Sequence, residues 1–202
     1  MPLLFTAPDS WSGMAFSLLL KWGPLDDQRV QAIFNAVWHS PDLTGVYLEC
    51  GCEPQEQHRW SASEVDPLTH LTFGVANLPS GRAVPCLVTM QRDEKEAVWL
   101  DFSLSIQALS QAFPEVGNAF WDVASTDDSS AAWIRQVEVW LAHLGRSVCA
   151  EVPFHFGLIG CESALDGTDG IMSVEEIPDI RNIGYLWPSE DGVRFFPRTG
   201  PL

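Results

Sequence analysis

The chain has 202 residues, 46% of them hydrophobic and 19% charged, a composition that predicts a single globular domain spanning residues 1–202. No run approaches the roughly 20 apolar residues of a membrane span, and the first ten residues lack the positive region of a secretory signal, so we expect a cytoplasmic protein. The formal net charge of -16 disfavours nucleic acid as a partner and favours a basic protein.

The first third of the chain predicts a strand, a helix and a second strand. Residues 14–22 form an apolar run that ends at Gly23-Pro24. Asp26 is a good N-cap for a helix over 26–39, whose apolar residues recur at helical spacing. Those residues are Val30, Ile33, Phe34, Val37 and Trp38. Residues 44–50 alternate as a strand does.

The connection 51–67 is polar, acidic and long enough to predict a contact region. Trp60 stands out in it, because a large aromatic in a polar loop either folds onto the core or serves as a binding anchor. We predict Trp60 as an anchor and the acidic side chains around it as partner-binding residues. The acidic residues in question are Glu53, Glu56, Glu64 and Asp66.

The same region carries the alternative hypothesis, a small enzyme that uses cysteine or metal chemistry around Cys50 to His70. Cys50 and Cys52 with His58 and His70 offer the ligand types that zinc prefers. The spacing is wrong, however, since one residue separates the cysteines and no second close pair follows. We therefore expect no metal and no cofactor, and we expect all five cysteines to be reduced.

Residues 68–103 predict an antiparallel meander of three strands at the centre of a sheet. The first two runs are separated by a Pro-Ser-Gly turn and the last two by the charged stretch 91–96. Pro85 has no amide hydrogen to donate, so the second strand must begin at an edge or a bulge.

Two helices are expected after the meander, a short one over 105–113 and the longest of the chain over 129–149. The long helix has a predicted buried stripe that includes Trp133 and Trp140. Its predicted solvent face consists of Arg135, Gln136, Glu138 and Arg146. Five of the nine tryptophans fall on predicted buried faces: Trp22, Trp38, Trp99, Trp133 and Trp140.

The last fifty residues predict a strand over 152–160, an acid-rich connection and a hairpin over 183–196 that turns at Asp-Gly. We predict that the acid-rich connection 162–191 lies beside the connection 51–67 and completes one acidic patch. Its candidate partner-binding residues are Asp166, Asp169, Glu175 and Glu176.

The predicted fold class is α+β: an antiparallel or mixed sheet with two principal helices packed on it and a C-terminal β-hairpin. The chain has no nucleophile-elbow, metal-helix or phosphate-loop motif. The favoured function is a non-catalytic interaction module that binds a basic protein, comparable by analogy alone to a toxin-immunity protein.

Overall fold

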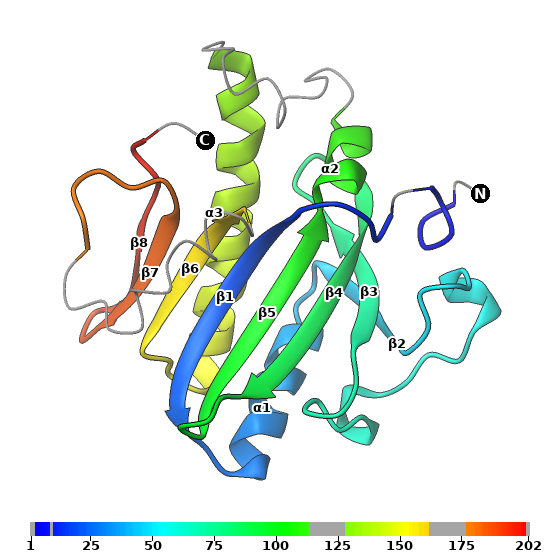
Figure 1. Ribbon diagram of the computed structural model, residues 1–202, viewed down its shortest axis with the longest axis horizontal. Coiled ribbons are helices and arrows are strands. Elements are labelled where there is room, and N and C mark those ends of the chain that lie inside the picture. Colours follow the sequence, from blue (N-terminus) through cyan, green and yellow to red (C-terminus); the bar gives the residue numbers. More distant parts are fainter. Residues whose placement is uncertain (1–2, 9, 114–127, 162–176, 201–202) are drawn as a thin grey trace.

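The structure, a computed structural model, describes residues 3–8, 10–113, 128–161 and 177–200, with 128–132 as backbone only. In these residues eight strands form one antiparallel sheet in the order β2-β3-β4-β5-β1-β6-β7-β8 (Figure 1). The strands are β1 (Ala15–Pro24), β2 (Leu43–Tyr47), β3 (Thr72–Asn77), β4 (Ala83–Arg92), β5 (Ala97–Ser105), β6 (Phe156–Cys161), β7 (Gly184–Ser189) and β8 (Gly192–Phe196). The expected α+β class is confirmed, including the C-terminal hairpin of β7 and β8.

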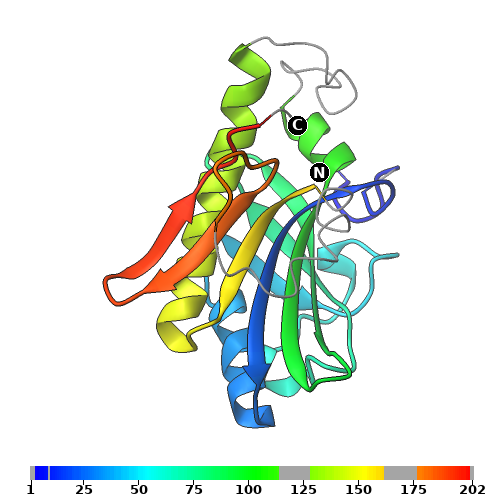
Figure 2. The same cartoon turned by 60° about the vertical axis from the view of Figure 1, so that its left-hand side comes forward.

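The two principal helices, α1 (Asp27–Trp38) and α3 (Asp128–Glu151), cover one face of the sheet (Figures 1 and 2). The shorter α2 (Ile106–Ala112) and two 3-10 turns, η1 (Pro54–Glu56) and η2 (Ala62–Glu64), lie in the connections. The predicted cap of α1 is confirmed, because the Asp26 side chain accepts the Arg29 amide at 2.8 Å. Within the described residues, no helix combines the length and apolar character that crossing a membrane requires.

The predicted meander is present as β3, β4 and β5, each hydrogen-bonded to the next. Pro85 pairs with Val75 of β3, whereas the pairing of β4 with β5 starts one residue later, at Cys86 and Leu104. Pro85 therefore lies where β4 has a neighbour on one side only, as its missing donor requires.

The core lies between the sheet and the two helices, and β1 runs through its middle. Leu18 of β1 pairs with Phe102 of β5 and with Ile159 of β6, and all three side chains are fully buried. Trp140 packs edge-on against Phe102 with ring centroids 5.8 Å apart, so α3 and the sheet share this core. Trp99 departs from the expectation: it lies half-buried on the opposite face of the sheet, with Lys21 Nζ 4.3 Å from its ring centroid.

The N-terminal strap, residues 3–8 and 10–12, covers part of that opposite face next to β2 and β3. Phe5 is 1% exposed and packs edge-on between Trp11 and Tyr47, with centroid distances of 5.1 and 5.7 Å. The Trp11 indole donates to the Phe5 carbonyl at 2.8 Å, which holds the strap in a closed loop.

Glu138 corrects the predicted solvent face of α3. Arg135 and Gln136 are exposed as expected, but Glu138 is only 1% exposed. The segment that follows β8 passes beside α3 (Figure 2). It brings the Arg198 guanidinium to 3.3 Å from the Glu138 carboxylate. A helical pattern read alone cannot reveal a segment that covers the polar face from outside.

Candidate functional site

A hollow of about 550 Å³ opens between the start of α1, the loop after η2 and the end of β4. It is lined by Asp27, Val30 and Gln31 of α1, by residues 63–69, and by Arg92 of β4. We call it the acidic groove, because three carboxylates and one guanidinium line it and leave two negative charges unbalanced.

Local hydrogen bonds fix the two walls of the groove. Asp26 caps α1 and so places Asp27 in its first turn, at the mouth of the groove. On the other wall, Gln31 Nε2 donates to the Ala62 carbonyl at 2.8 Å, which holds η2 against α1. The groove therefore has a defined width that depends on a side-chain to backbone contact.

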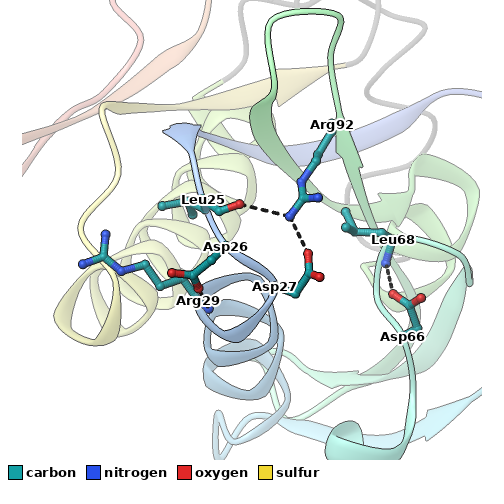
Figure 3. Close-up of polar contacts among 7 residues, drawn as sticks. All are labelled: Leu25, Asp26, Asp27, Arg29, Asp66, Leu68 and Arg92. Carbon is teal, nitrogen blue, oxygen red and sulfur yellow. Dashed lines mark hydrogen bonds and ion pairs between the residues drawn. The ribbon is translucent and has the colours of Figure 1, made fainter.

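Each carboxylate of the groove is held by one of its oxygens. Arg92 Nη2 donates to Asp27 Oδ1 at 2.7 Å, and the Leu68 amide donates to Asp66 Oδ1 at 3.0 Å (Figure 3). The Ser61 amide donates to Glu64 Oε2 at 3.0 Å. Among the described residues the second oxygen of each group accepts no hydrogen bond, so three oriented acceptors are available.

Arg92 is the cation of the groove, and its bonding is incomplete. Its Nη2 donates to Asp27 and to the Leu25 carbonyl, the latter at 3.0 Å, but its Nε is buried without a hydrogen-bond partner in the part of the chain that is described (Figure 3). The Arg92 side chain is 29% exposed and that of Asp27 is 88% exposed. Such an exposed, single-point ion pair contributes little to stability.

Apolar side chains form the floor of the groove, but most of them are covered, and Leu68 is the most accessible of the four. Val30 of α1 and Val65 of the loop are 1% and 4% exposed, Pro67 is buried, and Leu68 is half-buried. An apolar floor below charged rims suits long cationic side chains, whose stems are hydrocarbon and whose heads are charged.

The structure distributes the predicted partner-binding residues unevenly. Glu64 and Asp66 line the groove. Glu56 and Trp60 are exposed on the same connection but are not among the groove-lining residues. Trp60 is 37% exposed and packs edge-on against His58 at 4.8 Å, so it does not fold into the core. The other candidates, Asp166, Asp169, Glu175 and Glu176, lie outside the described residues.

Glu53 requires a correction, because it is buried and not part of an exposed patch. It is 4% exposed, and its carboxylate accepts the amides of Leu4 and Thr6 and the Thr6 hydroxyl, the last at 2.6 Å. Burial opposes its ionisation, but the hydrogen bonds from Thr6 and Leu4 outweigh burial and lower the pKa of Glu53. Its role is to hold the N-terminal strap.

The predicted contact between the two acidic connections is wrong for the part of the chain that can be compared. Residues 51–67 follow β2, at one edge of the sheet, whereas residues 177–191 lead into β7 and its turn to β8, at the other edge. Sequence gives charge but not strand order, and here six strands separate β2 from β8.

The alternative hypothesis of thiol or metal chemistry gains no support. The Cys52 thiol donates to Glu49 Oε2 at 3.5 Å, and this hydrogen bond with the Glu49 charge and partial burial raises the pKa of Cys52. Burial raises the pKa of Cys86 and of Cys149 and raises that of Cys161 to about 11. Thiols with raised pKa values are poor nucleophiles at neutral pH. In the described ranges, no three His, Cys, Asp or Glu side chains are grouped so that they could hold a metal ion.

A second hollow of about 470 Å³ lies between α1 and the end of α3. Its walls are mainly small side chains such as Ala32, Ala36 and Ser147, and its charged or titratable groups are His39 and Glu151. It has neither the convergent charge nor the apolar floor of the acidic groove, which remains the better candidate site.

Asp27 and Arg92 were not predicted as site residues. Asp27 was obscured by its neighbour Asp26, which carries the capping signal, and Arg92 belongs to a charged stretch that predicts only a turn.

No protein-family model matches the sequence, and comparisons with curated proteins and with solved structures also gave no match. The site must therefore be interpreted from its geometry and chemistry.

Proposed function

We propose that this chain is a non-catalytic, cytoplasmic interaction module that binds a basic protein partner, and that the acidic groove is the principal contact. The observation that carries the proposal is the arrangement of Asp27, Glu64 and Asp66, each held by one oxygen and presenting the other. Carboxylates that are already oriented lose little conformational freedom when a partner binds.

The chemistry of the groove favours several cationic side chains over a single metal ion. The three carboxylates line one groove, yet they form no group that could converge on one ion. Lysine or arginine stems can lie against the half-buried Leu68 while their heads reach separate carboxylates. An extended basic segment of a protein has this form, whereas a nucleic acid would bring phosphates toward a chain of net charge -16.

The overall charge supports the proposal in a second way. A strongly negative surface accelerates encounter with a basic protein, and this acceleration weakens as salt screens charges beyond about 10 Å at 0.1 M. Charge alone gives association rate more than affinity, so the oriented carboxylates and the apolar floor are needed for a lasting complex.

Arg92 gives the groove a specific prediction. It neutralises one carboxylate through a single contact, and a partner guanidinium that used both oxygens of Asp27 would bind that carboxylate better. Arg92→Gln should therefore tighten binding of a basic peptide by about threefold to tenfold. Arg29→Gln is the matched control, because Arg29 is exposed on the same helix as Asp27 and points away from Arg92 (Figure 3).

The test compares two double variants that remove the same charge from different places. Glu64→Gln with Asp66→Asn changes the groove, and Glu190→Gln with Asp191→Asn changes the exposed turn between β7 and β8 at the other edge of the sheet. Each protein is titrated with a fluorescent octa-arginine peptide and is used to capture partners from the native source. We expect the groove variant to lose at least about tenfold in affinity and the turn variant to lose less than about twofold. Equal losses would mean that binding follows net charge alone and that the groove is not a site.

A further inference from the structure

Residues 197–200, which follow β8 and are called here the tail segment, are joined to the chain before β7 by backbone hydrogen bonds. The amides of Thr199 and Gly200 donate to the Arg181 carbonyl at 2.9 and 2.8 Å. Arg181 Nε donates in return to the Pro197 carbonyl at 2.9 Å. The tail segment runs along α3 (Figures 1 and 2).

An ion pair joins the tail segment to α3. Arg198 Nε lies 3.3 Å from Glu138 Oε1, and these side chains are 11% and 1% exposed. The contact is poorly satisfied, because Glu138 Oε1 and Arg198 Nη1 are buried and neither has a hydrogen-bond partner in the described chain. A buried ion pair with such incomplete bonding does not recover the cost of removing its charges from water.

The hairpin beside the tail segment is anchored independently. Leu186 of β7 is fully buried in the main core, and Arg146 Nε of α3 donates to the Val193 carbonyl of β8 at 3.1 Å. The tail segment can therefore leave α3, and give up its hydrogen bonds to Arg181, while β7 and β8 remain in the sheet.

Three groups in the described chain influence the charge of Glu138. Arg198 comes from the tail segment, Arg135 lies one turn earlier on α3, and Cys161 ends β6. Burial raises the pKa of Glu138 to about 7, although Arg198 and Arg135 both act to lower it. Burial also raises the pKa of Cys161 to about 11, so that thiol is neutral where Glu138 titrates.

We propose that Glu138 makes the docking of the tail segment on α3 respond to pH near neutrality, with docking favoured when the carboxyl is protonated. When the tail segment leaves, the Glu138 carboxylate regains water and its pKa returns toward the ordinary value. The population of the released state therefore increases as the pH rises from about 4.5 to about 7, because Glu138 loses its proton at a lower pH in that state than in the docked state. The pair with Arg198 marks where the tail segment docks, but the neutral carboxyl is the form that holds it best.

Hydrogen exchange of the tail segment tests the proposal on the intact protein, after correction for the intrinsic pH dependence of exchange. Between about pH 5.5 and about pH 8.5, protection of the Thr199 and Gly200 amides, which both donate to the Arg181 carbonyl, should fall about tenfold or more in the wild type. In Glu138→Gln, whose side chain stays neutral, protection should remain high at both pH values. Glu151→Gln, an exposed substitution on the same helix, should behave as wild type, and β5 should stay protected in all three proteins.

Two results would overturn the proposal. In the first, wild type and Glu138→Gln show the same pH dependence; in the second, Glu138→Gln exposes the tail segment at every pH, which would mean that the ionised pair holds it. Carbon NMR of the Glu138 carboxyl in the unsubstituted protein provides an independent measurement. A titration midpoint near 7 supports the inference, and one near the ordinary glutamate value of about 4.5 refutes it.

Discussion

Two buried glutamates contact segments at opposite ends of the chain, and their environments shift the pKa of the carboxyl group in opposite directions. Glu53 holds the N-terminal strap over β2 and β3, and Glu138 holds the tail segment on α3. The carboxylate of Glu53 accepts several hydrogen bonds and has a lowered pKa, whereas that of Glu138 has one long ionic contact and a pKa raised to about 7. The number of donors that meet a buried carboxylate decides whether its charge stabilises or destabilises the fold.

The largest expected effect comes from the core beneath both attachments. Trp140→Ala should cost about 3–5 kcal/mol, because the indole packs on Phe102 and donates to Asp42 Oδ2 at 3.0 Å. Val139→Ala is the control, because Val139 is the next residue on the same helix and is 45% exposed. Urea unfolding measures both. If the opposite pKa shifts of the two glutamates have local causes, Trp140→Ala will lower the free energy of unfolding by the same amount at all pH values. The shape of the profile of stability against pH will then be unchanged.

Removal of the charge at Glu53 should have the next largest effect. Glu53→Gln replaces an acceptor by a donor group opposite Thr6 and Leu4, and we expect a loss of about 2–3 kcal/mol at neutral pH. Because the folded-state pKa is lowered, the stabilisation is present above the ordinary glutamate pKa and disappears as the pH falls through the folded value. Unfolding midpoints at neutral and acidic pH test this, with exposed Glu94→Gln as the control. A loss that persisted in acid would argue against a role of the Glu53 charge.

The effect at Glu138 should have the opposite sign. Its pKa is raised, so its contribution to stability is complete below about 4.5 and is lost as the pH rises toward 7. Glu138→Gln should therefore match the wild type near pH 5 and exceed it by about 1–3 kcal/mol near pH 8. Parallel unfolding curves at the two pH values measure the difference. A variant less stable than wild type near pH 8 would show that the ion pair with Arg198 stabilises the fold.

Both glutamates also show what the sequence could and could not predict. Strands, helices and the cap at Asp26 follow from local periodicity and side-chain chemistry, and these elements are present in the structure. The largest difference in bounds is the strand predicted over 152–160, because β6 begins only at Phe156. Glu53 and Glu138 look like ordinary solvent-facing acids in sequence. Each is buried and is contacted by a segment more than forty residues away in sequence, and no local pattern contains that information.

The candidate site was predicted only in part, for the same reason. Glu64 and Asp66 were identified because they stand in an acidic connection, which is a local property. Asp27 and Arg92 are 65 positions apart and meet only because the end of β4 reaches the start of α1. The strand order that creates this meeting also separates the two acidic connections that charge alone suggested would join.

The smallest stability effect is expected at the second ion pair, and it extends the comparison to exposed charges. Arg92 and Asp27 form a shorter contact than Arg198 and Glu138, at 2.7 against 3.3 Å, yet the side chain of Asp27 is 88% exposed. Water already solvates that carboxylate, so Arg92→Gln should change the free energy of unfolding by less than about 1 kcal/mol.

Arg198→Gln, which leaves Glu138 buried without its cation, should cost more than Arg92→Gln near pH 8 and lose most of that excess near pH 5. Unfolding of the two variants at both pH values decides the matter. Equal costs at both pH values would mean that burial does not distinguish the pairs, and the interpretation of Glu138 would fail with it. If Arg92→Gln changes the free energy of unfolding only slightly, the ion pair of Arg92 with Asp27 is not needed for stability. The proposal that the charges of the groove serve binding requires this result.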